Sequence, residues 1–201
     1  MQNNIETETA LWLKFPVKEL TQKLEENGYE RLRHKAFQKS YIYTPPKGIN
    51  PGGIMRVREV GSTVSVTVKS AVTTLQDGIK QRYKNTIKTD TLSNARVFVE
   101  LVGYKYSHMR ERFSTKYKKG NNHLIINYNP YGTVIDIDAE LKEILKMMDL
   151  FGFKKSDIIH QSADERWRAF CKTKKIPYDP NVIFDRPGSI KPPTGKGFEM
   201  P

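Results

Sequence analysis

The stretch Thr63-Val64-Ser65-Val66-Thr67-Val68-Lys69 decides the fold, because its valines and its polar residues alternate one by one. Successive side chains of a β-strand point to opposite faces, so the alternation predicts a strand with one dry face and one wet face. Other segments of the chain repeat this pattern. The class of protein therefore depends on what their wet faces carry and on where those faces point.

Basic residues occupy the polar face of several predicted strands. Arg56 and Arg58 alternate with apolar residues in the stretch 55–59. In the stretch 78–88 the residues that share a face are Lys80, Arg82, Lys84, Thr86 and Lys88, and in the stretch 106–116 they are His108, Arg110, Arg112, Ser114 and Lys116. Cations gathered in this way on neighbouring strands repel one another unless a polyanion lies on them. The pattern favours a polyanionic ligand.

Acidic residues show the same period at the two ends of the strand-forming region. Glu6 and Glu8 lie in the stretch 5–10, and Asp136 and Asp138 lie in the stretch 133–138. Carboxylates at positions i and i+2 of a strand share a face at roughly 7 Å and can share a hydrated divalent cation. A triphosphate with its Mg²⁺ would satisfy the acidic and the basic clusters together.

Four helices are predicted from start and stop signals. They cover residues 16–27, 91–102, 140–151 and 162–174. The first three end at a glycine followed by an aromatic residue, and the fourth begins with Ser162 and Glu165 in a capping box. Proline and glycine are frequent from Ile176 onward. We expect one domain over residues 1–175 and an extended tail over 176–201, which packs across the domain or contacts a protein partner.

A single charged strand face is usually the solvated side of a half-buried sheet. Here at least six predicted strands carry a charged face. The predicted helices are too few for all of these faces to be simply exposed while the helices pack elsewhere. An antiparallel sheet that closes on itself accounts for the pattern without free edges. The sequence therefore predicts an α+β fold, with a closed or nearly closed antiparallel β-barrel that has a charged interior and helices packed outside.

The amino-acid composition restricts the kind of ligand that the chain can bind and the cellular location that we expect for it. The chain has 201 residues and a formal net charge of +12, which suits a nucleic-acid binder, a polyphosphate binder or a nucleotide enzyme. No apolar run approaches the roughly 20 residues that span a bilayer, and the first residues lack the features of a signal peptide. We expect a soluble, cytoplasmic protein without membrane contact. The single cysteine, Cys171, excludes an internal disulfide.

From Ile5 to Gly152 the ordered series of motifs resembles the CYTH superfamily, or triphosphate tunnel metalloenzymes. This family includes class IV adenylate cyclases, thiamine triphosphatases, inorganic triphosphatases and fungal-type RNA triphosphatases. The stretch 6–10 resembles the family's E-x-E-x-K signature, Arg56-Val57-Arg58 its R-x-R motif and the stretch 132–138 its G-x-F-x-E-x-E strand. Lys69, Arg82 and the pair Arg110 and Arg112 resemble its further cationic positions.

The resemblance implies a metal-dependent enzyme that acts on a triphosphate inside a tunnel, as a phosphohydrolase or as a nucleotidyl cyclase. The residues implied as catalytic and as ligands of Mg²⁺ or Mn²⁺ are Glu6, Glu8, Asp136 and Asp138. The residues implied to bind phosphate are Arg56, Arg58, Lys69, Arg82, Arg110 and Arg112. The implied ligands are a nucleoside triphosphate, thiamine triphosphate or inorganic polyphosphate.

The sequence departs from the family pattern at several positions. Ala10 stands in place of the signature lysine, and Lys14, which has the same strand parity, is expected to reach inward instead. Lys84 replaces an acid that many members carry, and Asn127 or Asn129 replaces an aspartate. Fewer carboxylates and more cations predict weaker metal binding and stronger polyanion binding.

Two alternatives to the enzyme remain open from the sequence. One is a catalytically weakened tunnel that binds or sequesters nucleotides or polyphosphate. The other is a module that binds RNA, at a 5′-triphosphate end or along its backbone, with lysines such as Lys116, Lys118 and Lys119. For these lysines a solvated basic loop is an equally good interpretation.

Overall fold

The computed structural model describes residues 4–185 and 188–191. Its strands are β1 (Ile5–Trp12), β2 (Glu30–Thr44), β3 (Ile54–Val60), β4 (Thr63–Lys69), β5 (Thr73–Thr74), β6 (Lys80–Thr89), β7 (Lys105–Lys119), β8 (Asn122–Asn129) and β9 (Gly132–Asp138). Its α-helices are α1 (Val17–Glu26), α2 (Leu92–Leu101), α3 (Leu141–Phe151) and α4 (Ala163–Lys174), and short 3-10 turns cover Gln76–Gly78 and Lys155–Asp157. Within this part of the chain no helix is long and apolar enough to span a membrane.

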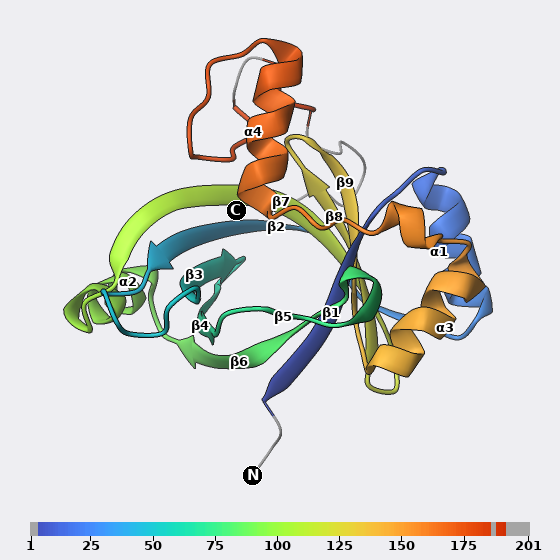
Figure 1. Cartoon of the computed structure of the whole chain (residues 1–201), viewed down its shortest axis with the longest axis horizontal. Coiled ribbons are helices and arrows are strands. Elements are labelled where there is room, and N and C mark those ends of the chain that lie inside the picture. Colours follow the sequence, from blue (N-terminus) through green and yellow to red (C-terminus); the bar gives the residue numbers. More distant parts are fainter. Residues whose placement is uncertain (1–3, 186–187, 192–201) are drawn as a thin grey trace.

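Eight of the described strands form a closed antiparallel barrel, which confirms the predicted α+β barrel (Figure 1). The strand order is β1-β9-β8-β7-β2-β3-β4-β6, and β6 pairs back onto β1 with Arg82 opposite Glu6. The short β5 extends the edge of β6. Because the ring is closed, its backbone donors and acceptors are paired between neighbouring strands.

Strands β2 and β7 are 15 residues long each and pair along most of their length. The sequence pattern indicates only the end of β2, near Tyr41 and Tyr43. It gives almost no indication of β8. The pairing contains register shifts near Arg33 and between Ile42 and Tyr43. Bulges of this kind bend a strand and increase its twist, which lets one long strand follow the curve of a barrel.

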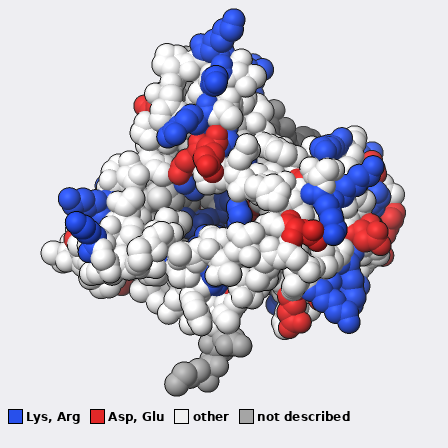
Figure 2. All heavy atoms as spheres, viewed as in Figure 1, with Lys and Arg blue, Asp and Glu red and all other residues white. Residues whose placement is uncertain are grey.

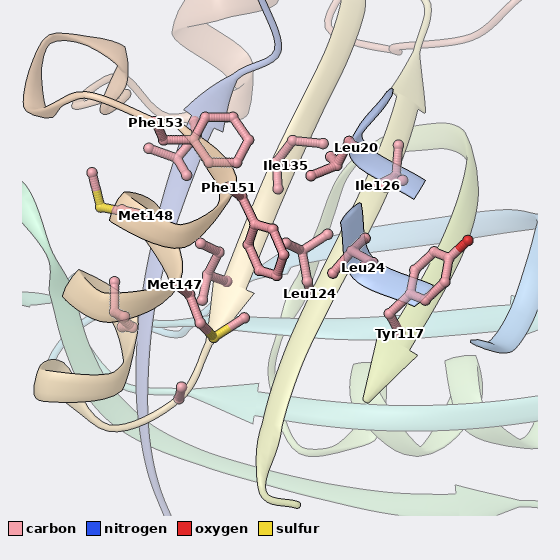
Figure 3. Close-up of a cluster of buried hydrophobic side chains, with 14 of the residues drawn as sticks. Leu20, Leu24, Tyr117, Leu124, Ile126, Ile135, Met147, Met148, Phe151 and Phe153 are labelled. Atoms are coloured by element: carbon pink, nitrogen blue, oxygen red, sulfur yellow. The ribbon is translucent and has the colours of Figure 1, made fainter. Parts of the chain in front are cut away.

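Helices α1 and α3 cover one side of the barrel, where the main hydrophobic core lies (Figure 1, Figure 3). Leu20 and Leu24 of α1 and Phe151 of α3 are fully buried there, together with Ile126 of β8 and Ile135 of β9. The alternate residues of β8 and β9 face away from these helices. The helices therefore bury the apolar face of the strands and leave the polar face to the other side.

Helix α2 covers the opposite side of the barrel in the same way (Figure 1). Its buried residues Ala95 and Val99 pack in one cluster with Met55 and Val57 of β3 and Val66 of β4. The valines of the stretch 63–69 thus form the dry face that their alternation predicted. Arg56 and Arg58 lie between these apolar residues in sequence and point to the other face of β3.

Three helices end at a glycine that is followed by an aromatic residue, and the three ends have the same local structure. Gly28, Gly103 and Gly152 have positive φ angles, which end their helices in a left-handed turn. The amide of the following aromatic residue then donates back into the helix, as from Phe153 to the Met148 carbonyl at 2.8 Å. Each aromatic ring is thereby placed against the sheet where the next segment begins.

Helix α4 and the segment after it pack at one end of the barrel. The predicted Ser162–Glu165 capping box is present, and Trp167 is fully buried. Val182 continues the sheet: its amide donates to the Met109 carbonyl at 2.9 Å, and its carbonyl accepts from the Glu111 amide at 2.7 Å. This part of the expected tail therefore lies against β7. Residues 186–187 and 192–201 lie outside the described part of the chain, and the expected contact with a protein partner stays a prediction.

Replacing Leu124 with alanine tests the core beneath α1 and α3. Leu124 is fully buried, so the Leu124→Ala variant should lose about 2–5 kcal/mol of the free energy of unfolding. The matched control is Leu101→Ala on α2, because Leu101 is 81% exposed and should change stability by less than about 0.5 kcal/mol. Urea unfolding measures both. Equal losses in the two variants would contradict this description of the core.

Candidate functional site

A pocket opens on the side of the strands that faces away from the helices α1, α2 and α3. Figure 2 shows a hollow near the centre of one face of the molecule, with Lys and Arg atoms in its depth. We call the pocket the arginine pocket. The residues that line it are Ser40, Ile42, Arg56, Arg58, Arg110, Glu111, Arg112, Asn127, Asn129, Tyr131, Val134, Asp136, Ala163, Arg166 and Val182.

Four of the six cations predicted to bind phosphate lie together in this pocket. Arg56 and Arg58 come from β3, and Arg110 and Arg112 come from β7. Strand β2 lies between them, since Ser40 is the register partner of both Arg58 and Arg110. Two pairs of arginines that are distant in sequence thus lie about two strand spacings apart, or about 10 Å.

The arginines are half-buried together, and the acids that line the pocket, Asp136 and Glu111, are fewer than the arginines. Burial and the neighbouring Arg112 lower the pKa of Arg56 to about 9, and burial and Arg56 lower the pKa of Arg58 well below its ordinary value. In addition, Arg56 Nε and two nitrogens of Arg166 are buried without a hydrogen-bond partner. Buried donors without acceptors are costly. The pocket is therefore suited to an anion that brings several oxygens.

Asp136 is the predicted acid that lines this pocket. Its Oδ2 accepts a hydrogen bond from Asn127 Nδ2 at 2.7 Å and lies 3.9 Å from Arg112 Nη1. Burial raises the pKa of Asp136, and the attraction of Arg112 only partly offsets this. Arg112 in turn donates from Nε to Gln38 Oε1 at 3.0 Å. These contacts hold the Arg112 guanidinium in place while part of it still faces the pocket.

The other acids and cations form a separate ion-pair network on β1, β4 and β6. The Glu6 carboxylate lies 2.6 Å from Lys69 Nζ, 2.6 Å from Lys84 Nζ and 3.2 Å from Arg82 Nε. Arg82 also pairs with Glu8. Burial alone would raise the pKa of Glu6, but Lys69 and Lys84 lower it to about 2. Lys69 and Arg82, predicted to bind phosphate, thus contact acids of the same chain.

The four predicted metal ligands do not converge on one point in this structure. Within the described residues, no three His, Cys, Asp or Glu side chains are grouped as a metal site. Glu6 is already held by three cations. Glu8, Asp136 and Asp138 fit better, because Glu8 lies opposite Asp138 in register, on neighbouring strands, and Asp138 has only a 3.9 Å ion pair with Lys84. Burial raises the pKa of Asp138, so its charge is poorly compensated, and carboxylate oxygens suit Mg²⁺ and Mn²⁺.

The expected inward position of Lys14 is wrong. Strand β1 ends at Trp12, so its alternation does not extend to Lys14. The Lys14 side chain is 59% exposed and pairs with Asp157 instead. Ala10, at the position of the signature lysine, lies directly opposite Asp136 on β9. No lysine of β1 therefore neutralises Asp136.

Helix α4 contributes to the site, which the sequence interpretation missed. Arg166 lines the arginine pocket, and Asp164 accepts from Arg110 Nη2 at 2.7 Å and lies 3.1 Å from His108 Nε2. The capping box locates the start of this helix in the sequence. No sequence signal shows, however, against which part of the barrel the helix packs.

Comparison with known proteins identifies the fold. No family model matches the sequence, and no curated protein matches it either. A Vibrio parahaemolyticus protein described as a "putative adenylate cyclase" has a TM-score of 0.67 at 14% identity, covering 82% of this chain and 98% of that chain. A Pyrococcus horikoshii protein has a TM-score of 0.64 at 17% identity, covering 78% and 96%. A "putative adenylyl cyclase" from Hippeastrum, described with a dominant triphosphatase activity, has a TM-score of 0.51 at 13% identity, covering 89% and 100%.

These similarities define the class of protein by its fold. The overall fold is shared at identities too low to carry over a substrate or a reaction. The chain has the fold of proteins described as putative adenylate cyclases, and this agrees with the resemblance to the CYTH superfamily that the order of its motifs indicated.

The Glu6→Gln variant tests the ion-pair network. The low pKa of Glu6 stabilises the fold above its ordinary value of 4.5, and this contribution is lost as the pH falls through about 2. At pH 7 the variant should lose about 3 kcal/mol of the free energy of unfolding, because Lys69 stays buried and keeps only its 3.8 Å ion pair with Glu8. Urea unfolding of both proteins from pH 7 to pH 2.5 measures the difference. A difference that does not shrink below pH 4.5 would contradict the assignment.

Proposed function

We propose that this chain binds the triphosphate group of a nucleotide, of thiamine triphosphate or of inorganic triphosphate in the arginine pocket. The observation that carries the proposal is the cluster of Arg56, Arg58, Arg110 and Arg112, which are half-buried in one pocket with unpaired guanidinium nitrogens of Arg56 and Arg166. Phosphate oxygens accept paired, charge-assisted hydrogen bonds from guanidinium groups. A chain of three phosphates offers enough oxygens and charge for several arginines at once.

Electrostatics supports a polyanion over a singly charged ligand. Burial and mutual repulsion lower the pKa values of Arg56, Arg58 and Arg112, so their charged forms are disfavoured without a ligand. Asp136 and Glu111 are the acids of the lining, and Asp164 pairs with Arg110. A triphosphate brings several further negative charges, and its binding relieves the repulsion as well as filling the hydrogen bonds.

The Arg112→Gln variant tests this binding. Loss of a charge-assisted phosphate contact should weaken the affinity for inorganic triphosphate about ten- to hundredfold. Because Arg112 also donates to Gln38 and lies 3.9 Å from Asp136, the thermal midpoint without ligand is measured for each variant, and affinities are compared at a temperature where both are folded. The control is Lys105→Gln on the same strand, at an exposed position outside the pocket. Isothermal titration calorimetry measures the affinities, and equal affinities in the two variants would overturn the proposed site.

The reaction we propose at this site is hydrolysis of the triphosphate or cyclisation of a nucleotide. Glu8 and Asp138, which lie opposite each other in register, would contribute ligands to Mg²⁺ or Mn²⁺, with Asp136 two residues along β9 as a further candidate; the metal when bound polarises phosphoryl oxygens. The arginines would neutralise charge that develops on the leaving phosphate group. In hydrolysis the attacking group is water, and in cyclisation it is a ribose hydroxyl, so the two differ mainly in how the ligand is positioned.

A binding module without turnover is the second candidate. It is favoured by Glu6, which the described structure holds in ion pairs with Lys69, Arg82 and Lys84. It is also favoured by Ala10, which leaves the position opposite Asp136 without a lysine. Such a chain would hold a nucleotide or polyphosphate tightly and release it unchanged.

One assay separates the two candidates. The protein is incubated with ATP, thiamine triphosphate or inorganic triphosphate in Mg²⁺ or Mn²⁺, and phosphate, pyrophosphate and cyclic nucleotide are resolved. For an enzyme, we expect turnover that Asp136→Asn and Asp138→Asn abolish, while both variants still bind the ligand. Binding with no turnover in either metal would leave the sequestering module. A 5′-triphosphorylated RNA serves as a further ligand, and a steep fall of its affinity with salt would indicate backbone contacts.

A further inference from the structure

We infer that Arg166, on the C-terminal helix α4, is a ligand-binding residue of the arginine pocket, so that phosphate binding and the docking of α4 onto the barrel stabilise each other. The inference rests on the proposed function and adds to it a contact from outside the barrel strands. The first turns of α4 reach the pocket, where Ala163 and Arg166 are part of its lining.

The Arg166 side chain has unused hydrogen-bonding capacity at the pocket. Its Nε and Nη1 are buried without a hydrogen-bond partner, and its guanidinium lies 5.6 Å from the centre of the Tyr131 ring. Tyr131 also lines the pocket. A cation–π contact orients the guanidinium plane but accepts no conventional N–H hydrogen bond. The missing acceptors are what phosphate oxygens would supply.

Helix α4 is held firmly enough to place Arg166. Asp164 contacts Arg110 and His108 of β7, which joins the first turn of the helix to the pocket wall. Trp167 is fully buried, and its Nε1 donates to the Asp179 carbonyl at 2.7 Å. A guanidinium fixed in this way loses less conformational entropy on binding than a free surface side chain does.

The same helix carries a matched arginine that faces away from the pocket. Arg168 is exposed, and its guanidinium lies 5.0 Å from the centre of the Tyr178 ring. Arg166 and Arg168 are thus arginines of the same helix, and each lies over an aromatic ring of its own. They differ in their access to the pocket. A comparison of the two separates ligand binding from the general effect of losing a cation.

Because β7 and α4 both contact the ligand in this arrangement, their docking is linked to binding. A ligand that binds the docked state better than the undocked state stabilises the docked state by the same factor. Bound triphosphate should therefore protect the backbone amides of residues 163–174 from exchange with solvent. Loss of Arg166 should reduce this protection without opening the helix in the absence of ligand.

The experiment compares Arg166→Gln and Arg168→Gln in the full chain with inorganic triphosphate as the probe. Arg166→Gln should weaken binding about ten- to hundredfold, and Arg168→Gln should weaken it less than about twofold. The thermal midpoint of Arg166→Gln without ligand should equal or exceed that of the unmodified chain, since the substitution removes a half-buried guanidinium whose buried Nε and Nη1 have no hydrogen-bond acceptor. Hydrogen exchange of α4, with and without ligand, gives the second readout.

The outcomes distinguish this inference from the proposed function. If Arg112→Gln loses binding but Arg166→Gln behaves like Arg168→Gln in affinity and exchange, then Arg166 is not a ligand-binding residue and the pocket still is a triphosphate site. If Arg166→Gln lowers the thermal midpoint and leaves the affinity unchanged, its role is structural and the inference is wrong. If the unmodified chain binds no triphosphate, the proposed function fails and the inference fails with it.

Discussion

The closure of the sheet, where β6 pairs back onto β1, is the constraint on which the rest of the structure depends. Burying the apolar faces of β3 and β4 under α2, and of β8 and β9 under α1 and α3, leaves the polar faces of these strands on the other side of the same ring. Charges that are distant in sequence then become neighbours. Glu6 of the first strand reaches Lys69 of β4 across the intervening β6, at 2.6 Å.

The charges brought together by closure divide into two unequal parts. Around β1, β4 and β6, the acids Glu6 and Glu8 are paired with lysines and an arginine, and this part is close to internally balanced. Around β3 and β7, four arginines share a pocket with little acid. The first part can stabilise the barrel without a ligand. The second part has more arginines than acids, and this difference is why we propose anion binding ahead of any particular reaction.

The C-terminal segment turns an open barrel end into a pocket. Helix α4 supplies Ala163 and Arg166 to the lining, and Val182 pairs with β7 between Met109 and Glu111. The ion pair from Asp164 to Arg110, and the 3.1 Å contact of Asp164 with His108 Nε2, couple this segment to the pocket wall. The site is therefore assembled from the middle of the chain and from its end, and a chain cut after α3 would lack one of its walls.

The sequence by itself determined the parity of the strands, the helix ends and the candidate cations, because alternation and capping are local properties of the backbone. It also predicted the barrel, since so many charged faces could not all be solvated. It could not supply the full length of β2 or the exposed position of Lys14, because bulges and strand ends depend on neighbouring strands. Only the tertiary structure decided that Glu6 is neutralised while Arg56 is not, and that Arg166 joins the pocket, because these facts depend on which distant side chains lie within a few ångströms of each other.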